Sequence, residues 1–278
     1  MQAAVVGGGT MGVGIAYVMA VAGIPTTVVE PNAERASAMM QEIDGALANG
    51  ISRGKLTDSD AASARAALTV VSAVSELPEG LDLVIETVSE RADIKETVLR
   101  EIDAKHPLMI ASNTSSMSIN ALSGFVQDPT RFIGLHFFNP VWSIPLVEII
   151  RGTSTSQATL DQALAFVVAI GKESAVINDA PGFATSRLDL IVAAESIRMV
   201  EEGVGSPEDI DRAITLAYRH PVGPLTLTDI VGLDVRLDIM RQLERSLGER
   251  FAPPQLLIDM VERGDLGKKS GRGFYEWA

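Results

Sequence analysis

The feature that most constrains the fold is a glycine-rich turn between an apolar segment and a helical pattern near the N-terminus. Residues 3–16 contain the spacing Gly7-x-Gly9-x-x-Gly12. Gly7 permits a sharp turn, Gly9 lets the backbone approach a pyrophosphate, and Gly12 lets the helix pack close to the strand. The helix that begins near Thr10 presents N–H groups and a positive dipole end to phosphates. Because an apolar strand precedes the turn and a helix follows it, a dinucleotide site is favoured over an ordinary strand-to-helix turn.

An acidic residue ends the next predicted strand. Residues 26–30 are Thr-Thr-Val-Val-Glu, and Glu30 therefore follows the glycines by about 20 residues, as a dinucleotide site requires. Its carboxylate would accept hydrogen bonds from the adenosine ribose hydroxyls and repel a 2′-phosphate. Pro31 and Asn32 follow, with no arginine beside them to receive such a phosphate. The sequence therefore predicts NAD rather than NADP.

Length and charge bound the function. The chain has 278 residues, 46% of them hydrophobic, which suits one large domain or two moderate ones. A formal net charge of −13 argues against a general nucleic-acid or anionic-membrane surface. Cysteine is absent, the histidines are few and the acids are scattered, so no metal site is expected. With a strand at Met1-Gln2 and no long apolar run, we expect no signal peptide, no membrane span and a cytoplasmic location.

Predicted strands alternate with predicted helices over the first two thirds of the chain. This alternation indicates an α/β fold with a Rossmann-type doubly wound, parallel sheet covered on both faces. Ligands of such sheets bind beyond the carboxyl ends of the strands. The glycine turn, Glu30, Glu86, residues 112–116 and His136 all lie at such ends, so we expect them to face one crevice.

The pattern changes at residues 178–183, Asn-Asp-Ala-Pro-Gly-Phe. Beyond them we find helical segments and no convincing strand. We therefore predict an NAD-binding domain over residues 1–179 and an all-helical C-terminal domain over residues 180–278.

His136 is the first candidate for acid–base chemistry. Of the three histidines, only His136 ends a predicted strand on the ligand side, whereas His106 and His220 precede prolines. A lone histidine there is more often structural, but Glu148 lies on the neighbouring strand pattern within an apolar run. A carboxylate partner fixes the imidazole tautomer and stabilises the imidazolium. The alternative for Glu148 is an edge-strand acid facing water.

The polar run Ser112-Asn-Thr-Ser-Ser116 also ends a predicted strand. As a functional site it would bind the nicotinamide ribose and the reacting oxygen. As a structural feature it would cap the helix from Ser118 onward, and both roles are compatible.

Motifs along the whole chain resemble those of the L-3-hydroxyacyl-CoA dehydrogenase family, and the short 3-hydroxybutyryl-CoA dehydrogenases are the most similar in length. The motifs are residues 7–16, Leu83-Val-Ile-Glu86, Ala111–Ser116, His136-Phe-Phe-Asn-Pro140, Pro181-Gly-Phe183, His220-Pro-Val-Gly-Pro224 and Leu266–Tyr275. The family's fold is a Rossmann domain followed by a helical domain that dimerises.

The resemblance implies roles for individual residues. His136 would be the general base, Glu148 its partner, and Ser115 would contact both substrate and cofactor. Arg53 and Lys55 would lie near the CoA moiety. The full set of expected cofactor-binding residues is Gly7, Gly9, Thr10, Met11, Gly12, Glu30, Glu90, Lys95, Asn113, Ser115, Asn139 and Lys269, and the expected substrate-binding residues are Ser115, Ser186, Arg53 and Lys55.

Two departures from the family pattern concern the substrate. Ser186 stands where the family usually has an asparagine that points into the active site. Residues 142–148 are Trp-Ser-Ile-Pro-Leu-Val-Glu, where the acyl-CoA enzymes usually have Lys-Leu-Val-Glu. The proline at position 145 resembles relatives that oxidise free hydroxy acids, such as carnitine or gulonate dehydrogenases.

We therefore expect an NAD-dependent enzyme that interconverts an L-3-hydroxyacyl-CoA and a 3-oxoacyl-CoA, with a homodimer formed through the helical domain. The alternatives are a dehydrogenase of a free or carrier-protein-bound 3-hydroxy acid, and a non-catalytic NAD-binding protein in structural use.

Overall fold

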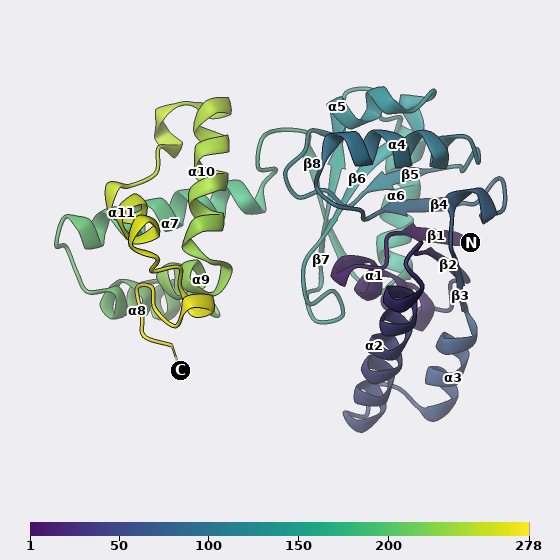
Figure 1. The fold of residues 1–278 in the computed structure, drawn as a ribbon, viewed down its shortest axis with the longest axis horizontal. Coiled ribbons are helices and arrows are strands. Elements are labelled where there is room, and N and C mark those ends of the chain that lie inside the picture. The colour runs from purple at the N-terminus through teal and green to yellow at the C-terminus, as the bar shows by residue number, and fades with distance from the viewer. Residues whose placement is uncertain (278) are drawn as a thin grey trace. The chain divides into compact units, whose positions relative to one another are not determined.

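A computed structural model describes residues 1–277 and divides into two compact units. The first runs from Met1 to Ala180 and the second begins at Pro181. Figure 1 shows a sheet flanked by helices in the first unit and a bundle of helices in the second. No helix within residues 1–277 is long and apolar enough to cross a membrane.

The first unit is built on an eight-stranded sheet with the order β3-β2-β1-β4-β5-β6-β7-β8. The strand order reverses between β1 and β4, which is where a doubly wound sheet opens a crevice for ligands. The strands are β1 (Ala3–Val6), β2 (Thr26–Val29), β3 (Leu68–Val71), β4 (Leu83–Glu86), β5 (Ile110–Ser112), β6 (Phe132–Phe137), β7 (Leu146–Arg151) and β8 (Glu173–Asn178).

Helices cover both faces of this sheet (Figure 1). One apolar core joins α1, α2, α3 and α6 to alternate residues of the strands, whereas α4 and α5 contact β4 and β6 on the other face. The helices are α1 (Thr10–Val21), α2 (Ala33–Ser52), α3 (Asp58–Ala66), α4 (Ala92–Asp103), α5 (Ile119–Leu122) and α6 (Gln157–Ala169).

Short polar side chains fix where these helices begin. The Asn32 side chain accepts a hydrogen bond from the Arg35 N–H and caps α2. Thr57 and Asp60 form a reciprocal capping box at the start of α3. These caps satisfy N–H groups that have no partner within the helix.

One strand pairing differs from the parallel sheet expected from the sequence. β7 runs antiparallel to β6, while every other neighbouring pair in the sheet is parallel. Only residues 138–145 connect β6 to β7, and a parallel crossover needs about a dozen residues or more. The resulting register places His136 directly opposite Glu148.

The second unit packs helices around its own apolar core. Leu190, Ile197, Leu225, Leu237 and Met240 are among its buried residues. The C-terminal tail is fastened to this core by the buried Asp229, which accepts hydrogen bonds from the N–H groups of residues 274 and 275 and from the indole of Trp277. The helices are α7 (Thr185–Glu201), α8 (Pro207–Tyr218), α9 (Pro224–Val231), α10 (Leu233–Leu247) and α11 (Gln255–Arg263).

Candidate active site

The glycine turn between β1 and α1 has the geometry of a phosphate-binding loop. Gly7 has φ +113°, a conformation that side chains rarely adopt, so the sharp turn requires glycine. A Cβ on Gly12 would lie 1.9 Å from the Gly7 carbonyl oxygen, so α1 can approach the turn only because Gly12 has no side chain. A Cβ on Gly9 would meet nothing within 4 Å, so the space beside this glycine, at the start of α1, is open.

This turn borders a cavity of about 750 Å³ at the carboxyl ends of β1 and β2. Glu30 lies in the cavity wall, where its two carboxylate oxygens accept hydrogen bonds from the N–H groups of Gly8 and Asn32, each at 2.9 Å. The carboxylate is thus held at the position where adenosine ribose hydroxyls bind in such folds. Other lining residues include Gly7, Gly9, Thr10, Met11, Arg35, Ser72 and Val74.

The cavity also contains an arginine, which corrects one step of the sequence argument. No arginine directly follows Glu30 in the chain, but Arg35 in the first turn of α2 lines the same cavity. Its guanidinium donates to the Gly8 carbonyl oxygen at 2.6 Å and forms an ion pair with Glu42. The local sequence gave no reason to expect this, because the Arg35 side chain returns to the glycine turn from a helix.

A second cavity of about 350 Å³ collects the residues expected to perform the chemistry. Met11, Thr87 and Val88 line both this cavity and the previous one, so the two adjoin. The remaining lining residues are Glu90, Asn113, Ser115, His136, Phe137, Phe138 and Asn139.

His136 and Glu148 form a buried pair at this second cavity. Nδ1 of the imidazole lies 2.8 Å from a carboxylate oxygen of Glu148, which is fully buried. The Phe138 ring packs 4.4 Å from the imidazole, measured between centroids. Since an ionised carboxylate only accepts hydrogen bonds, the pairing favours the tautomer with a proton on Nδ1. This arrangement orients a histidine for proton transfer through Nε2.

Asn113 fixes the strand that carries His136. Its side-chain oxygen accepts a hydrogen bond from the N–H of Phe137 at 2.9 Å, while its own N–H donates to the Glu86 carbonyl oxygen. The carboxyl ends of β4, β5 and β6 are therefore joined at the cavity wall.

A buried network of charges supports the same wall. Lys95 is 1% exposed, and its ammonium group lies 2.7 Å from Glu86 and 3.2 Å from Glu90. Glu86 also accepts hydrogen bonds from the Ser112 hydroxyl and the Val88 N–H. Because a buried charge is costly without a partner, the three ionisable groups depend on one another.

Glu90 connects this network to the polar run after β5. It accepts hydrogen bonds from the Thr114 hydroxyl, from the N–H groups of Ser115 and Ser116, and from the Ser116 hydroxyl. Burial opposes ionisation of Glu90, but the hydrogen bond from Thr114 and the charge of Lys95 outweigh it, so the pKa of Glu90 is lowered. Glu90 therefore holds the backbone that presents Ser115 to the cavity.

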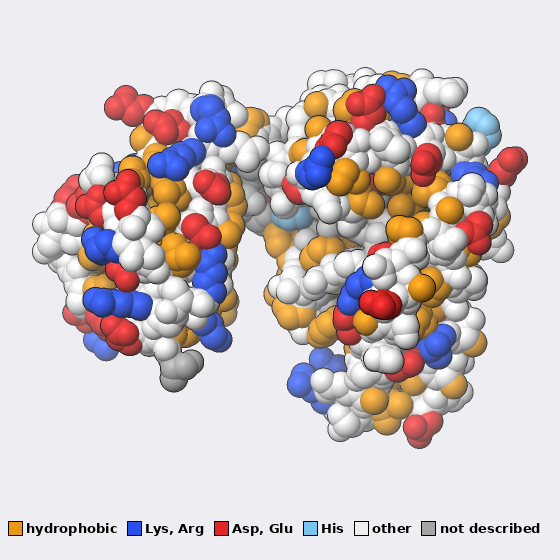
Figure 2. Space-filling model, viewed as in Figure 1, with side chains coloured by type: hydrophobic (Ala, Val, Ile, Leu, Met, Phe, Trp, Pro, Cys, Tyr) orange, Lys and Arg blue, Asp and Glu red, His pale blue; other side chains and the backbone are white. Residues whose placement is uncertain are grey.

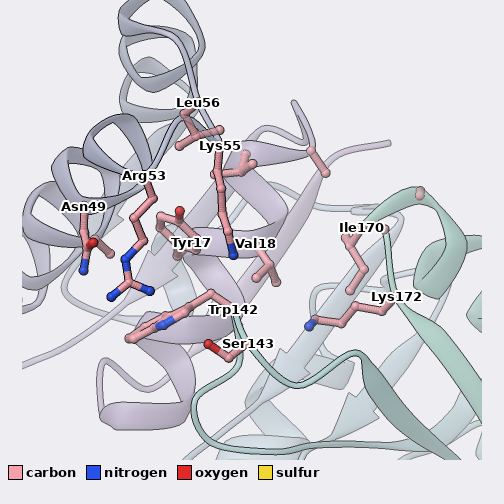
Figure 3. A pocket seen from close by; sticks show the side chains of 16 residues that line it. Tyr17, Val18, Asn49, Arg53, Lys55, Leu56, Trp142, Ser143, Ile170 and Lys172 are labelled. Atoms are coloured by element: carbon pink, nitrogen blue, oxygen red, sulfur yellow. The ribbon is translucent and has the colours of Figure 1, made fainter.

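A third cavity, of about 440 Å³, lies between the C-terminal parts of α1 and α2, the 138–145 loop and the end of α6. Figure 3 shows Arg53 and Lys55 from the connection between α2 and α3, and Lys172 from the connection between α6 and β8, extending into it beside the Trp142 indole. Among the described residues that line it, none is acidic. Cations next to an indole suit a ligand with phosphates and a planar ring.

Lys172 also holds the loop that carries Trp142. Its ammonium group donates to the carbonyl oxygens of Val141 and Ile144, at 2.5 and 2.6 Å. Burial lowers the pKa of Lys172. The Trp142 ring meets the Tyr17 ring edge-on at 5.8 Å between centroids.

The structure gathers most of the expected site residues but not all of them. The expected cofactor and catalytic residues line the first two cavities, apart from Glu148 and Lys95, which stand behind the walls, Gly12, which packs against the turn, and Lys269. Lys269 and Ser186 belong to the second unit, where Lys269 pairs with Asp234 and Ser186 lies in the first turn of α7. Within residues 1–277, no group of three or more His, Cys, Asp or Glu side chains is placed to hold a metal ion.

Several residues at these sites were not singled out from the sequence. The Thr87 hydroxyl donates to the carbonyl oxygens of Val6 and Gly7 and so holds the glycine turn in place. The sequence signal for this role was a threonine directly after the predicted strand at residues 83–86. Tyr17 and Lys172 both line the third cavity, although long stretches of chain separate them, so only the fold places them there.

Comparison with known proteins identifies the family. The family profile for "3-hydroxyacyl-CoA dehydrogenase, NAD binding domain" matches residues 2–180, and that for the C-terminal domain of the same family matches residues 182–277. The chain belongs to the 3-hydroxyacyl-CoA dehydrogenase family. It is therefore an NAD-dependent oxidoreductase of the type that acts on CH–OH groups, and the glycine turn lies in its NAD-binding domain.

Individual relatives match over nearly their whole lengths. A 3-hydroxybutyryl-CoA dehydrogenase of Bradyrhizobium diazoefficiens is 40% identical over 98% of this chain and 94% of its own. A probable 3-hydroxybutyryl-CoA dehydrogenase of Bacillus subtilis is 39% identical over 99% of this chain and 97% of its own. The crystal structure of (S)-3-hydroxybutyryl-CoA dehydrogenase from Ralstonia eutropha superposes with a TM-score of 0.95 at 37% identity, covering 100% of this chain and 99% of that one.

The Glu90 interactions predict a pH-dependent stability difference. The lowered pKa means that ionised Glu90 stabilises the fold above its ordinary pKa of 4.5, and that this stabilisation is lost as the pH falls through the folded-state pKa. We expect Glu90→Gln to lower Tm at pH 7, and the difference from wild type to shrink at about pH 3.5. Thermal unfolding followed by circular dichroism measures both, with Glu79→Gln on an exposed turn as the control. A difference that does not change with pH would contradict this role.

Proposed function

We propose that the chain interconverts an L-3-hydroxyacyl-CoA and a 3-oxoacyl-CoA, with His136 as general base and Glu148 as its partner. The observation that carries the proposal is the buried 2.8 Å contact between the two side chains beside the cavity that adjoins the glycine turn. When bound, NAD supplies the hydride acceptor.

The residues of the chain would handle the proton and the orientation of the substrate. In oxidation, Nε2 of His136 takes the proton of the 3-hydroxyl group, and Glu148 stabilises the imidazolium that forms. In reduction, the same imidazolium returns the proton to the oxygen. Ser115 and Asn139 line the cavity from two other loops, and we propose that Ser115 holds the reacting oxygen while Asn139 helps to hold the nicotinamide end.

We further propose that the third cavity receives the nucleotide end of CoA. Support comes from the gathering of Arg53, Lys55 and Lys172 around Trp142, in a chain whose net charge is −13. The relatives named as 3-hydroxybutyryl-CoA dehydrogenases favour a short acyl group. The departures at Pro145 and Ser186 favour the second candidate, a free or carrier-bound 3-hydroxy acid.

The role of His136 predicts a loss of turnover without loss of cofactor. His136→Ala should lower kcat by about 10² to 10⁴, the usual contribution of a positioned base, and Glu148→Gln should lower kcat as well. NADH affinity, followed by nicotinamide fluorescence, should stay at the wild-type value in both variants. His106→Ala changes an exposed histidine of the same unit and should leave kcat unaltered. Near-normal kcat in His136→Ala would refute the assignment.

The nature of the substrate follows from a comparison of acetoacetyl-CoA with free acetoacetate as substrates for NADH oxidation. The double variant Arg53→Ala/Lys55→Ala should raise KM for the thioester by about tenfold or more, because hydrogen bonds to charged groups are worth about 1.5–3 kcal/mol. Its kcat should change little. Arg65→Ala/Arg91→Ala removes two surface charges outside the cavity and serves as the matched control. Wild-type turnover that is equally fast with acetoacetate would favour the free-acid alternative.

We also propose that the chain forms a homodimer through its second unit. Support comes from large apolar side chains exposed on it, including Leu188, Leu216 and Tyr218, which are 64%, 75% and 72% exposed. Figure 2 shows hydrophobic side chains at the surface of this unit on the face displayed. Light scattering coupled to size-exclusion chromatography should give twice the 29.5 kDa chain mass, and a mass of one chain at micromolar concentration would exclude the dimer.

A further inference from the structure

Arg35 and Glu30 both form hydrogen bonds to the backbone of Gly8, which lines the first cavity. The Gly8 N–H donates to the Glu30 carboxylate, and the Gly8 carbonyl oxygen accepts from Nε of Arg35. An acidic and a basic side chain therefore lie together beside the glycine turn. If Glu30 receives the adenosine ribose, as the sequence predicts for the NAD site, Arg35 stands next to the 2′ position of that ribose.

Glu42 occupies the outer edge of the Arg35 guanidinium. The two carboxylate oxygens accept from Nη1 at 2.6 Å and from Nη2 at 3.0 Å, so the contact is bidentate. Together with the bond from Nε to Gly8, these contacts engage all three guanidinium nitrogens. The hydrogen bond with Glu42 raises the pKa of Arg35, and the same bond lowers the pKa of Glu42. Both groups are thus ionised at neutral pH.

A phosphate and a carboxylate compete for the same face of an arginine. Both bind the guanidinium through two parallel hydrogen bonds. A 2′-phosphate could bind the face of Arg35 formed by Nη1 and Nη2 only after displacing Glu42, and it would then face the charges of two carboxylates, Glu30 and Glu42, against one cation. NAD carries no phosphate at this position and meets neither obstacle.

We propose that Glu42 is a cofactor-specificity residue, which discriminates against NADP by occupying the guanidinium of Arg35. Glu30 excludes the 2′-phosphate by direct repulsion, whereas Glu42 acts from α2 by withholding the nearest cation. The preference for NAD thus depends on the Arg35–Glu42 pair as well as on Glu30, the strand-end acid from which NAD was predicted. The chain retains a latent 2′-phosphate site that removal of one carboxylate should uncover.

The test is a double-mutant cycle on cofactor binding. Glu42→Gln, Arg35→Gln and the double variant are titrated with NADPH and with NADH, and binding is followed by nicotinamide fluorescence. Glu42→Gln should tighten NADPH binding by about tenfold, as expected for removing one charge near a phosphate, and change the Kd of NADH by less than about twofold. Adding Arg35→Gln should abolish the gain, because the phosphate then has no cation.

Glu34→Gln is the matched control. Glu34 is an exposed acid in the first turn of the same helix, and its replacement changes the net charge equally without freeing Arg35. An equal gain for NADPH in Glu34→Gln and Glu42→Gln would show a general charge effect and overturn the proposal. The proposal would also fail if Arg35→Gln left the gain intact, or if Glu42→Gln weakened both cofactors, which would indicate damage to the fold. The readout is binding rather than turnover, so it is independent of which substrate the enzyme takes.

Discussion

The candidate site depends on a buried ion pair between Glu86 and Lys95, beside the residues expected to perform the chemistry. Burial of either charge alone would cost several kcal/mol, and the opposite charge of the partner offsets part of that cost. Together they tie α4 to the carboxyl end of β4, while Ser112 adds β5 through its hydrogen bond to Glu86. Glu90 carries the same connection to the backbone of Ser115. Because removing one charge would leave another buried without its partner, this charge network fixes the cavity wall that contains residues 112–116.

The other half of the wall comes from a reversal of strand direction. Because the loop after β6 is too short for a crossover, β7 returns antiparallel, and the register brings Glu148 opposite His136. Residues directly opposed in an antiparallel pair have side chains on the same face and within reach of each other. The His136–Glu148 contact is therefore a consequence of backbone pairing rather than of flexible side chains. Lys172 steadies the connecting loop through its carbonyl oxygens.

Local patterns made most of the fold and the cofactor site predictable from the sequence. The glycine spacing, Glu30 and the apolar strands that end in polar residues are signals carried by a few consecutive residues, and α1 and β2 begin at Thr10 and Thr26 as predicted. The direction of β7 was missed, since alternation of strands and helices does not distinguish a short return from a crossover. Arg35, Tyr17 and Lys172 were missed for another reason: each acts on a group that only the fold brings near.

The distribution of charge follows from what such an enzyme would have to bind. A chain with net charge −13 repels anions at long range, yet NAD and a CoA thioester are both anionic. At the glycine turn, backbone N–H groups and the α1 dipole can receive a pyrophosphate without a cationic side chain. Because the pyrophosphate needs no cationic side chain there, the crevice can contain the acidic Glu30 for a ribose, and Arg35 can be paired with Glu42. The third cavity is lined by the C-terminal parts of α1, α2 and α6, and Arg53, Lys55 and Lys172 gather there instead. In the proposed function, the two anionic ligands therefore bind through different groups. NAD binds to backbone N–H groups beside a carboxylate, and the CoA thioester binds to cationic side chains.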